Sequence, residues 1–101
     1  MRTGVMWKAL RQAVYETEGF YLRLSDDASP AQEVLLFFPH GVVALLVMIR
    51  SGAKLEPKQV KRIERFRDYA IPVYYAGSSH GIYSAVVGAA QSIDLGMNYH
   101  P

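Results

Sequence analysis

Basic side chains gather in one short stretch of this sequence. Seven of its eleven Lys and Arg residues lie between positions 50 and 67: Arg50, Lys54, Lys58, Lys61, Arg62, Arg65 and Arg67. A local cluster of cations can bind phosphate groups, although the formal net charge of the chain is only +2. The alternative is an ordinary solvated helix face, in which Glu64 and Asp68 lie near Arg65 and Lys61. If the chain binds nucleic acid, we expect these residues, Arg67 excepted, to meet phosphates.

Nucleophiles and soft metal ligands give no comparable signal. The chain has no cysteine, and its histidines lack the spacing of metal ligands: His40, His80 and His100. Ser79 and His80 are neighbours, but adjacent residues in a turn seldom point at one another, and no acid orients the imidazole. The seven tyrosines could stack on bases or line an interface, although most should be half-buried. We therefore predict no metal centre built on Cys or His and no Ser–His catalysis.

The basic cluster follows the most apolar segment of the chain. Residues 42–49 are all apolar and rich in β-branched types, which predicts a strand buried on both faces. Pro57 suits the first turn of a helix, where its missing N–H is not needed, and a helical apolar stripe follows it. Residues 72–76 have the composition of a strand. Strand, helix and strand at this spacing predict a right-handed crossover with two parallel strands.

The segments before this crossover unit add a helix and two strands. Apolar residues at helical spacing predict a helix over 5–17, and strand composition marks 20–24 and 33–38. Pro39-His40-Gly41 then predicts a tight antiparallel hairpin into the strand at 42–49, because Pro sets a turn and Gly accepts positive φ.

The C-terminal part completes the predicted order of elements. Ser78 or Ser79 can cap a last helix whose apolar face runs from Ile82 to Ile93. Residues 94–101 are expected to form a loose tail. The whole pattern predicts one α/β domain over 1–93, with a mixed four-stranded sheet and helices on both faces in the order α-β-β-β-α-β-α.

Length and composition bear on assembly and location. A chain of 101 residues leaves roughly a third of its unfolded surface exposed, so we expect a homodimer, formed through the tyrosine-rich strand or the last helix. The uncharged span from Val34 to Ile49 is shorter than the roughly 20 residues that cross a bilayer, so no membrane segment is expected. The absence of cysteine favours a reducing compartment, and no secretory signal is visible, which together indicate a cytoplasmic location.

The element order and the central stretch resemble a known nuclease family. The order is similar to the core of the restriction-endonuclease-like (PD-(D/E)XK) nucleases, and the centre resembles the virus-type replication-repair nuclease (VRR-NUC) domain. There, a strand with Glu-x-Lys leads to a Gly-rich turn, a Leu-Ser-Pro-x-Gln-like helix start and a Gly-x-Pro-Val-like strand entry. The corresponding segments here are Met48-Ile49-Arg50, Ser51-Gly52-Ala53-Lys54, Leu55-Glu56-Pro57-Lys58-Gln59 and Tyr69-Ala70-Ile71-Pro72-Val73.

The resemblance implies metal-dependent cleavage of DNA, but the sequence departs from the family at the metal ligands. The family holds Mg²⁺ or Mn²⁺ with the Asp of Gly-x-Pro-Asp, the Glu of Glu-x-Lys and usually a helical Glu. The matching segments here are Ala28-Ser29-Pro30-Ala31 and Met48-Ile49-Arg50, so Ala31 and Met48 replace two carboxylates. A Met thioether is a poor ligand for a hard dication, whereas Arg50 keeps the positive charge of the family's Lys.

A displaced carboxylate is the alternative to a lost site. Glu33 lies two residues beyond Ala31, on the same face of the expected strand. No Asp or Glu occurs between Val34 and Leu55, so the second ligand would have to come from elsewhere: Glu16, Glu18, Asp26 or Asp27. An active enzyme would then use Glu33, Arg50 and Gln59. Gln59 matches the family's helical Gln and could touch a phosphate, or it could be an ordinary polar residue of the first helical turn. Without a metal, we expect Glu33 to pair with Arg50.

Two functions follow from these observations. The first is a nuclease-fold protein that has lost catalysis, needs no cofactor, and binds DNA or a protein partner. In the latter case it could act as a phage-type inhibitor in the host cytoplasm. The second is an active endonuclease, dependent on Mg²⁺ or Mn²⁺, that cuts branched or flapped DNA with a site rearranged around Glu33.

Overall fold

The chain forms the predicted series of helices and strands. The computed structural model describes residues 3–25, 29–50 and 52–99, and among these the side chains of 4–25, 29–50 and 52–92. The elements are α1 (Thr3–Glu16), β1 (Phe20–Arg23), β2 (Ala31–Phe38), the 3-10 turn η1 (Pro39–Gly41), β3 (Val42–Ile49), α2 (Pro57–Asp68), β4 (Val73–Ala76) and α3 (Ser79–Tyr99).

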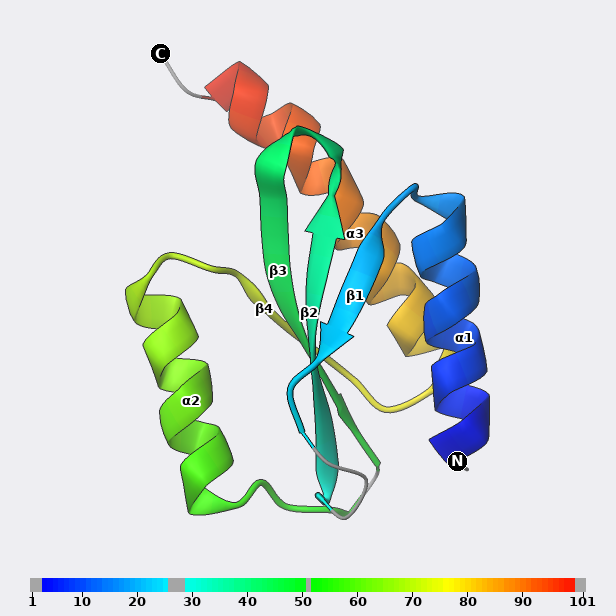
Figure 1. Cartoon of the computed structure of the whole chain (residues 1–101), viewed down its shortest axis with the longest axis vertical. Coiled ribbons are helices and arrows are strands. Elements are labelled where there is room, and N and C mark those ends of the chain that lie inside the picture. The colour runs from blue at the N-terminus through cyan, green and yellow to red at the C-terminus, as the bar shows by residue number, and fades with distance from the viewer. Residues whose placement is uncertain (1–2, 26–28, 51, 100–101) are drawn as a thin grey trace.

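The strands form the mixed four-stranded sheet that the sequence predicts. They lie in the order β1-β2-β3-β4. The β1–β2 and β2–β3 pairs are antiparallel, whereas β3 and β4 are parallel, as the crossover through α2 requires. Helices α1 and α3 cover one face of the sheet and α2 lies on the other (Figure 1). The predicted α/β architecture is therefore confirmed.

Each face of the sheet has its own apolar core. Alternate residues of β2 and β3, among them Val34, Leu46 and Met48, pack against α1 and α3. The residues between them face α2, where Ala31, Leu45, Val47 and Ile63 form a smaller cluster. Because side chains alternate along a strand, a shift of one residue moves a side chain from one core to the other. This alternation decides which residues can share a site.

Local sequence signals explain the turns around these strands. His40 and Gly41, with φ of 72° and 79°, both occupy the left-handed region in the hairpin between β2 and β3. Pro57 is the first residue of α2. The Ser78 hydroxyl accepts a hydrogen bond from the N–H of Gly81 at 3.0 Å, so Ser78 is the residue that caps α3.

The last helix is longer than its apolar pattern predicts. It continues to Tyr99, so residues 94–99 are helical and the expected loose tail is wrong for this segment. Residues 100–101 lie outside the described part of the chain.

No helix within the described residues combines the length and the apolar character that would let it cross a membrane.

Candidate functional site

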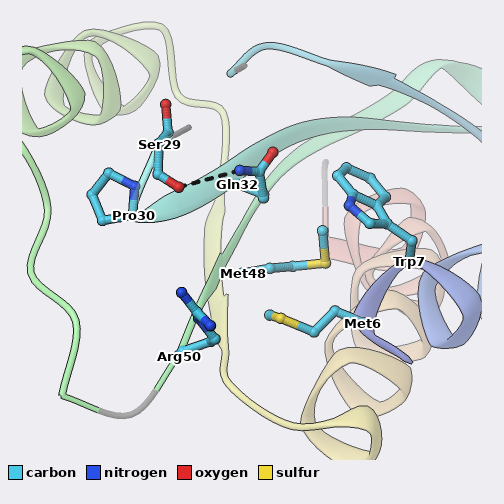
Figure 2. Close-up of a pocket in the computed structure, with 7 residues that line it drawn as sticks. All are labelled: Met6, Trp7, Ser29, Pro30, Gln32, Met48 and Arg50. Atoms are coloured by element: carbon cyan, nitrogen blue, oxygen red, sulfur yellow. Dashed lines mark hydrogen bonds between the residues drawn. The ribbon is translucent and has the colours of Figure 1, made fainter. Parts of the chain in front are cut away.

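A small pocket lies at the end of β3, where Met48-Ile49-Arg50 leaves the sheet. We call it the motif pocket; its lining residues are Met6, Trp7, Ser29, Pro30, Gln32, Met48 and Arg50. Its volume is about 40 Å³. Figure 2 shows that α1 contributes Met6 and Trp7, β2 contributes Gln32 and β3 contributes Met48, while Arg50 follows the end of β3. Gln32 and Met48 are buried, whereas Arg50 is exposed at the rim.

The register of β2 and β3 places Ala31 and Met48 on opposite faces of the sheet. Gln32 lies opposite Met48, and both side chains point into the motif pocket. Ala31 lies opposite Ile49 and faces α2 instead. An acid at position 31 could therefore not bind the same metal ion as an acid at position 48. Gln32 is therefore the residue of β2 that faces the motif pocket opposite Met48. Its Nε2 donates to the backbone carbonyl of Ser29 at 3.3 Å.

The described part of the motif pocket does not suit a hard metal ion. None of its lining residues is acidic, and the described residues contain no group of three His, Cys, Asp or Glu able to hold a metal. Helix α1 contributes Met6 and Trp7 to the lining, and neither side chain offers an oxygen ligand. Glu16 is ten residues beyond Met6, about 15 Å along the helix, and accepts hydrogen bonds from Gln12 and Tyr83. Asp26 and Asp27 lie outside the described residues.

Glu33 lies on the opposite face of the sheet and is already fully bonded. Its side chain is 0% exposed. Arg62 donates from Nε to Oε1 at 2.8 Å and from Nη2 to Oε2 at 2.6 Å. Oε2 also accepts from Gln59 Nε2 at 3.3 Å and from the Ser25 hydroxyl at 3.2 Å. Four donors surround the carboxylate, so no side of it is open to a metal in this arrangement.

Glu33 forms an ion pair with Arg62. The expected ion pair between Glu33 and Arg50 is therefore wrong. Arg50 is two residues beyond Met48 and lines the motif pocket, on the face away from Glu33. Helix α2 instead brings Arg62 over Glu33. Hydrogen bonding to Glu33 raises the pKa of the Arg62 guanidinium, and burial opposes this effect. The catalytic set of the alternative function is thus divided, with Glu33 and Gln59 on one face and Arg50 on the other.

Gln59 holds α2 against the sheet. It is fully buried, its Oε1 accepts from the N–H of Glu56 at 3.1 Å, and its Nε2 donates to the Ala31 carbonyl at 2.9 Å. Because Gln59 is buried, it is not placed to touch a phosphate, and it is not the ordinary polar residue of the first helical turn that was the alternative. The spacing of Glu56 and Gln59 around Pro57 is that of a capping box, and this signal could have indicated the structural role.

The basic residues divide between two places. Arg50 borders the motif pocket, and Lys54 is exposed in the connection between β3 and α2. The others lie on one side of α2, where Lys58, Lys61, Arg62 and Arg65 line a hollow of about 270 Å³. A second hollow of about 250 Å³ is lined by Arg62, Arg65, Phe66 and Tyr69. We call the residues of both hollows the α2 stripe. Arg67 lies apart from it and donates to the Tyr75 hydroxyl at 3.3 Å.

Comparison with known proteins supports the fold. A solved structure described as a VRR_NUC domain is similar to this chain with a TM-score of 0.65 and 25% sequence identity. The likeness covers 82% of this chain and 91% of that one. The chain is a VRR-NUC-like domain. No family model and no curated protein matches its sequence. This VRR-NUC-like domain thus has a nuclease fold, as the element order indicated.

Proposed function

We propose that this VRR-NUC-like domain binds DNA and does not cut it in a metal-dependent reaction. The observation that carries the proposal is the pair Gln32 and Met48, which face each other in the motif pocket. The resemblance implies carboxylates at two such positions. An amide and a thioether bring no negative charge to offset the cost of stripping water from Mg²⁺.

Arg50 supports DNA binding at the same place. It is an exposed cation beside a pocket with no acidic lining residue, and no described residue forms an ion pair with it. A phosphate there meets uncompensated positive charge, and Arg can bind it through two parallel hydrogen bonds. Lys54 and the α2 stripe extend the basic surface away from this point.

A salt titration of DNA binding tests this proposal. The logarithm of the affinity should fall linearly with the logarithm of salt concentration, by about 0.9 per phosphate contact. Arg50→Ala should flatten that slope by about one unit, because one contact is lost. Lys8→Ala, which removes an exposed cation on α1, should leave the slope unchanged. Binding that does not respond to salt, or no binding to duplex, branched or single-stranded DNA, would contradict the proposal.

A protein partner is the second candidate, and one observation favours it. Phe20 and Leu22 lie on the same face of the edge strand β1 and are 59% and 52% exposed, so two neighbouring large apolar side chains are open to a partner. Such a partner could be a host nuclease, if the protein is an inhibitor of phage type. The same salt titration separates the two candidates, because an apolar contact depends little on salt.

We also propose a homodimer, and the exposure of β4 supports that strand as its contact surface. The apolar face of α3 is occupied within the protomer, since Ile82, Val86 and Ala89 are fully buried against the sheet and α1. The tyrosine-rich strand β4 lies at the edge of the sheet, and Tyr75 is 47% exposed. We therefore expect a second copy to meet β4. Sedimentation should give a dimer at high micromolar concentration, and a strict monomer there would oppose this proposal.

A further inference from the structure

The α2 stripe is a continuous surface that lies away from the motif pocket. Its residues recur at helical spacing, and the two hollows along it share Arg62 and Arg65. Lys58, Lys61 and Arg62 lie in its first turns. Arg65 lies in the last turn of α2, beside Phe66 and next to Tyr69 at the end of the helix. Lys58, Lys61 and Arg65 form no ion pair with any described residue. Arg62, in contrast, forms an ion pair with Glu33, so its charge is already neutralised.

The sheet beside the stripe is only partly covered. Figure 1 shows α2 on this face of the sheet and α1 and α3 on the other. It packs over Leu45 and Val47 of β3, while Arg62 reaches across to Glu33 on β2. Beyond β2, the exposed side chains of Phe20 and Leu22 lie on the same face, opposite Phe37 and Leu35. The rings of Phe20 and Phe37 stack with their centroids 4.7 Å apart.

We propose that the α2 stripe and the exposed side of β1 form a track for single-stranded nucleic acid. Proteins bind single strands by combining cations that follow the phosphates with aromatic rings on which bases stack. Here Lys58, Lys61 and Arg65 supply the cations. Tyr69, which is 70% exposed, and Phe20 supply the rings. A duplex keeps its bases inside and cannot use these rings, so the surface selects an unpaired strand.

Charge favours this occupant over a second copy of the chain. In a two-fold contact the same surface meets itself, so the unpaired cations of the stripe would approach their own copies. A nucleic-acid strand instead offers a negative charge at each phosphate. The inference rests on the proposed DNA binding and adds the form of DNA that this face recognises.

Fluorescence anisotropy with a labelled oligo-dT tests the track. Tyr69→Ala and Phe20→Ala should each weaken binding about five-fold or more, because a stacking contact is lost. Neither change should alter the salt slope, since no phosphate contact is removed. Tyr69→Phe should retain most of the affinity because it keeps the ring. Tyr15→Ala is the matched control: Tyr15 is 82% exposed but lies on α1, and its removal should have no effect.

Each outcome bears on a different claim. Equal affinities for Tyr69→Ala, Phe20→Ala and Tyr15→Ala would overturn the track. If the wild-type protein bound duplex DNA but not oligo-dT, the track would be wrong and the proposed DNA binding would stand. If it bound neither, both the track and the proposed DNA binding would be wrong. If Phe20→Asp changed the sedimentation of the protein and not its oligo-dT affinity, a second copy would be the occupant and the inference would be wrong.

Discussion

Replacing Arg62 by Ala is expected to lower the free energy of unfolding by about 3 kcal/mol. The change leaves the Glu33 carboxylate, which is 0% exposed, with only the neutral donors Gln59 and Ser25. Removing one partner of a buried ion pair costs about 3–5 kcal/mol because the remaining charge stays buried. The Arg62 side chain is 38% exposed, so in the variant water can partly solvate the Glu33 carboxylate in its place. The expected loss of stability therefore lies at the low end of this range.

Urea denaturation measures this loss, and the neighbouring arginine supplies the control. Arg65 is exposed and forms no ion pair with any described residue, so Arg65→Ala should change stability by less than about 0.5 kcal/mol. Replacing Glu33 and Arg62 together by Leu should recover much of the loss, because no unpaired charge remains. If Arg62→Ala and Arg65→Ala unfolded at the same urea concentration, the ion pair would not hold α2 as we describe.

The sequence predicts the elements well because their signals are local. The run of apolar residues at 42–49, the Pro39-His40-Gly41 turn and Pro57 each depend on nearby residues alone, and all three lie where expected. The extension of α3 has no such signal. The apolar period that predicts the helix stops at Ile93, and the segment that continues it contains Gly96.

The site was harder to predict because it depends on register and on distant contacts. The sequence motif points to Ala31, whereas the residue opposite Met48 is Gln32, one position further along, and one residue reverses the face of a strand. The partner of Glu33 lies 29 residues further along the chain, and several cations could have reached it. Only the position of α2 over the sheet selects Arg62.

Introducing two carboxylates is expected to create a metal site in the motif pocket. Gln32→Asp with Met48→Glu places both acids on the same face, opposite each other across β2 and β3. Two carboxylates can hold Mn²⁺ where an amide and a thioether cannot. Calorimetry should detect Mn²⁺ binding to the double variant and none to the wild type. Trp7, the only tryptophan in the chain, lines this pocket, so its fluorescence should change on binding.

The strand register provides the matched control for this experiment. Ala31→Asp with Met48→Glu adds the same two carboxylates, but the Asp points toward α2 and Glu33 while the Glu points into the motif pocket. This pair should not bind Mn²⁺, and the buried Asp should lower stability. Binding by both pairs, or by neither while the Gln32 variant stays folded, would show that the motif pocket is not where we place the lost metal.

The most direct test of the account is the wild-type protein itself, incubated with Mg²⁺ or Mn²⁺ and with duplex, branched and single-stranded DNA. The account predicts that DNA is bound in a salt-dependent manner and that none of these substrates is cut. A chelator should therefore leave the DNA binding unchanged. Cleavage that requires the metal and disappears in Arg50→Ala or Glu33→Gln would contradict the account, because it would show that this chain still assembles a working metal site.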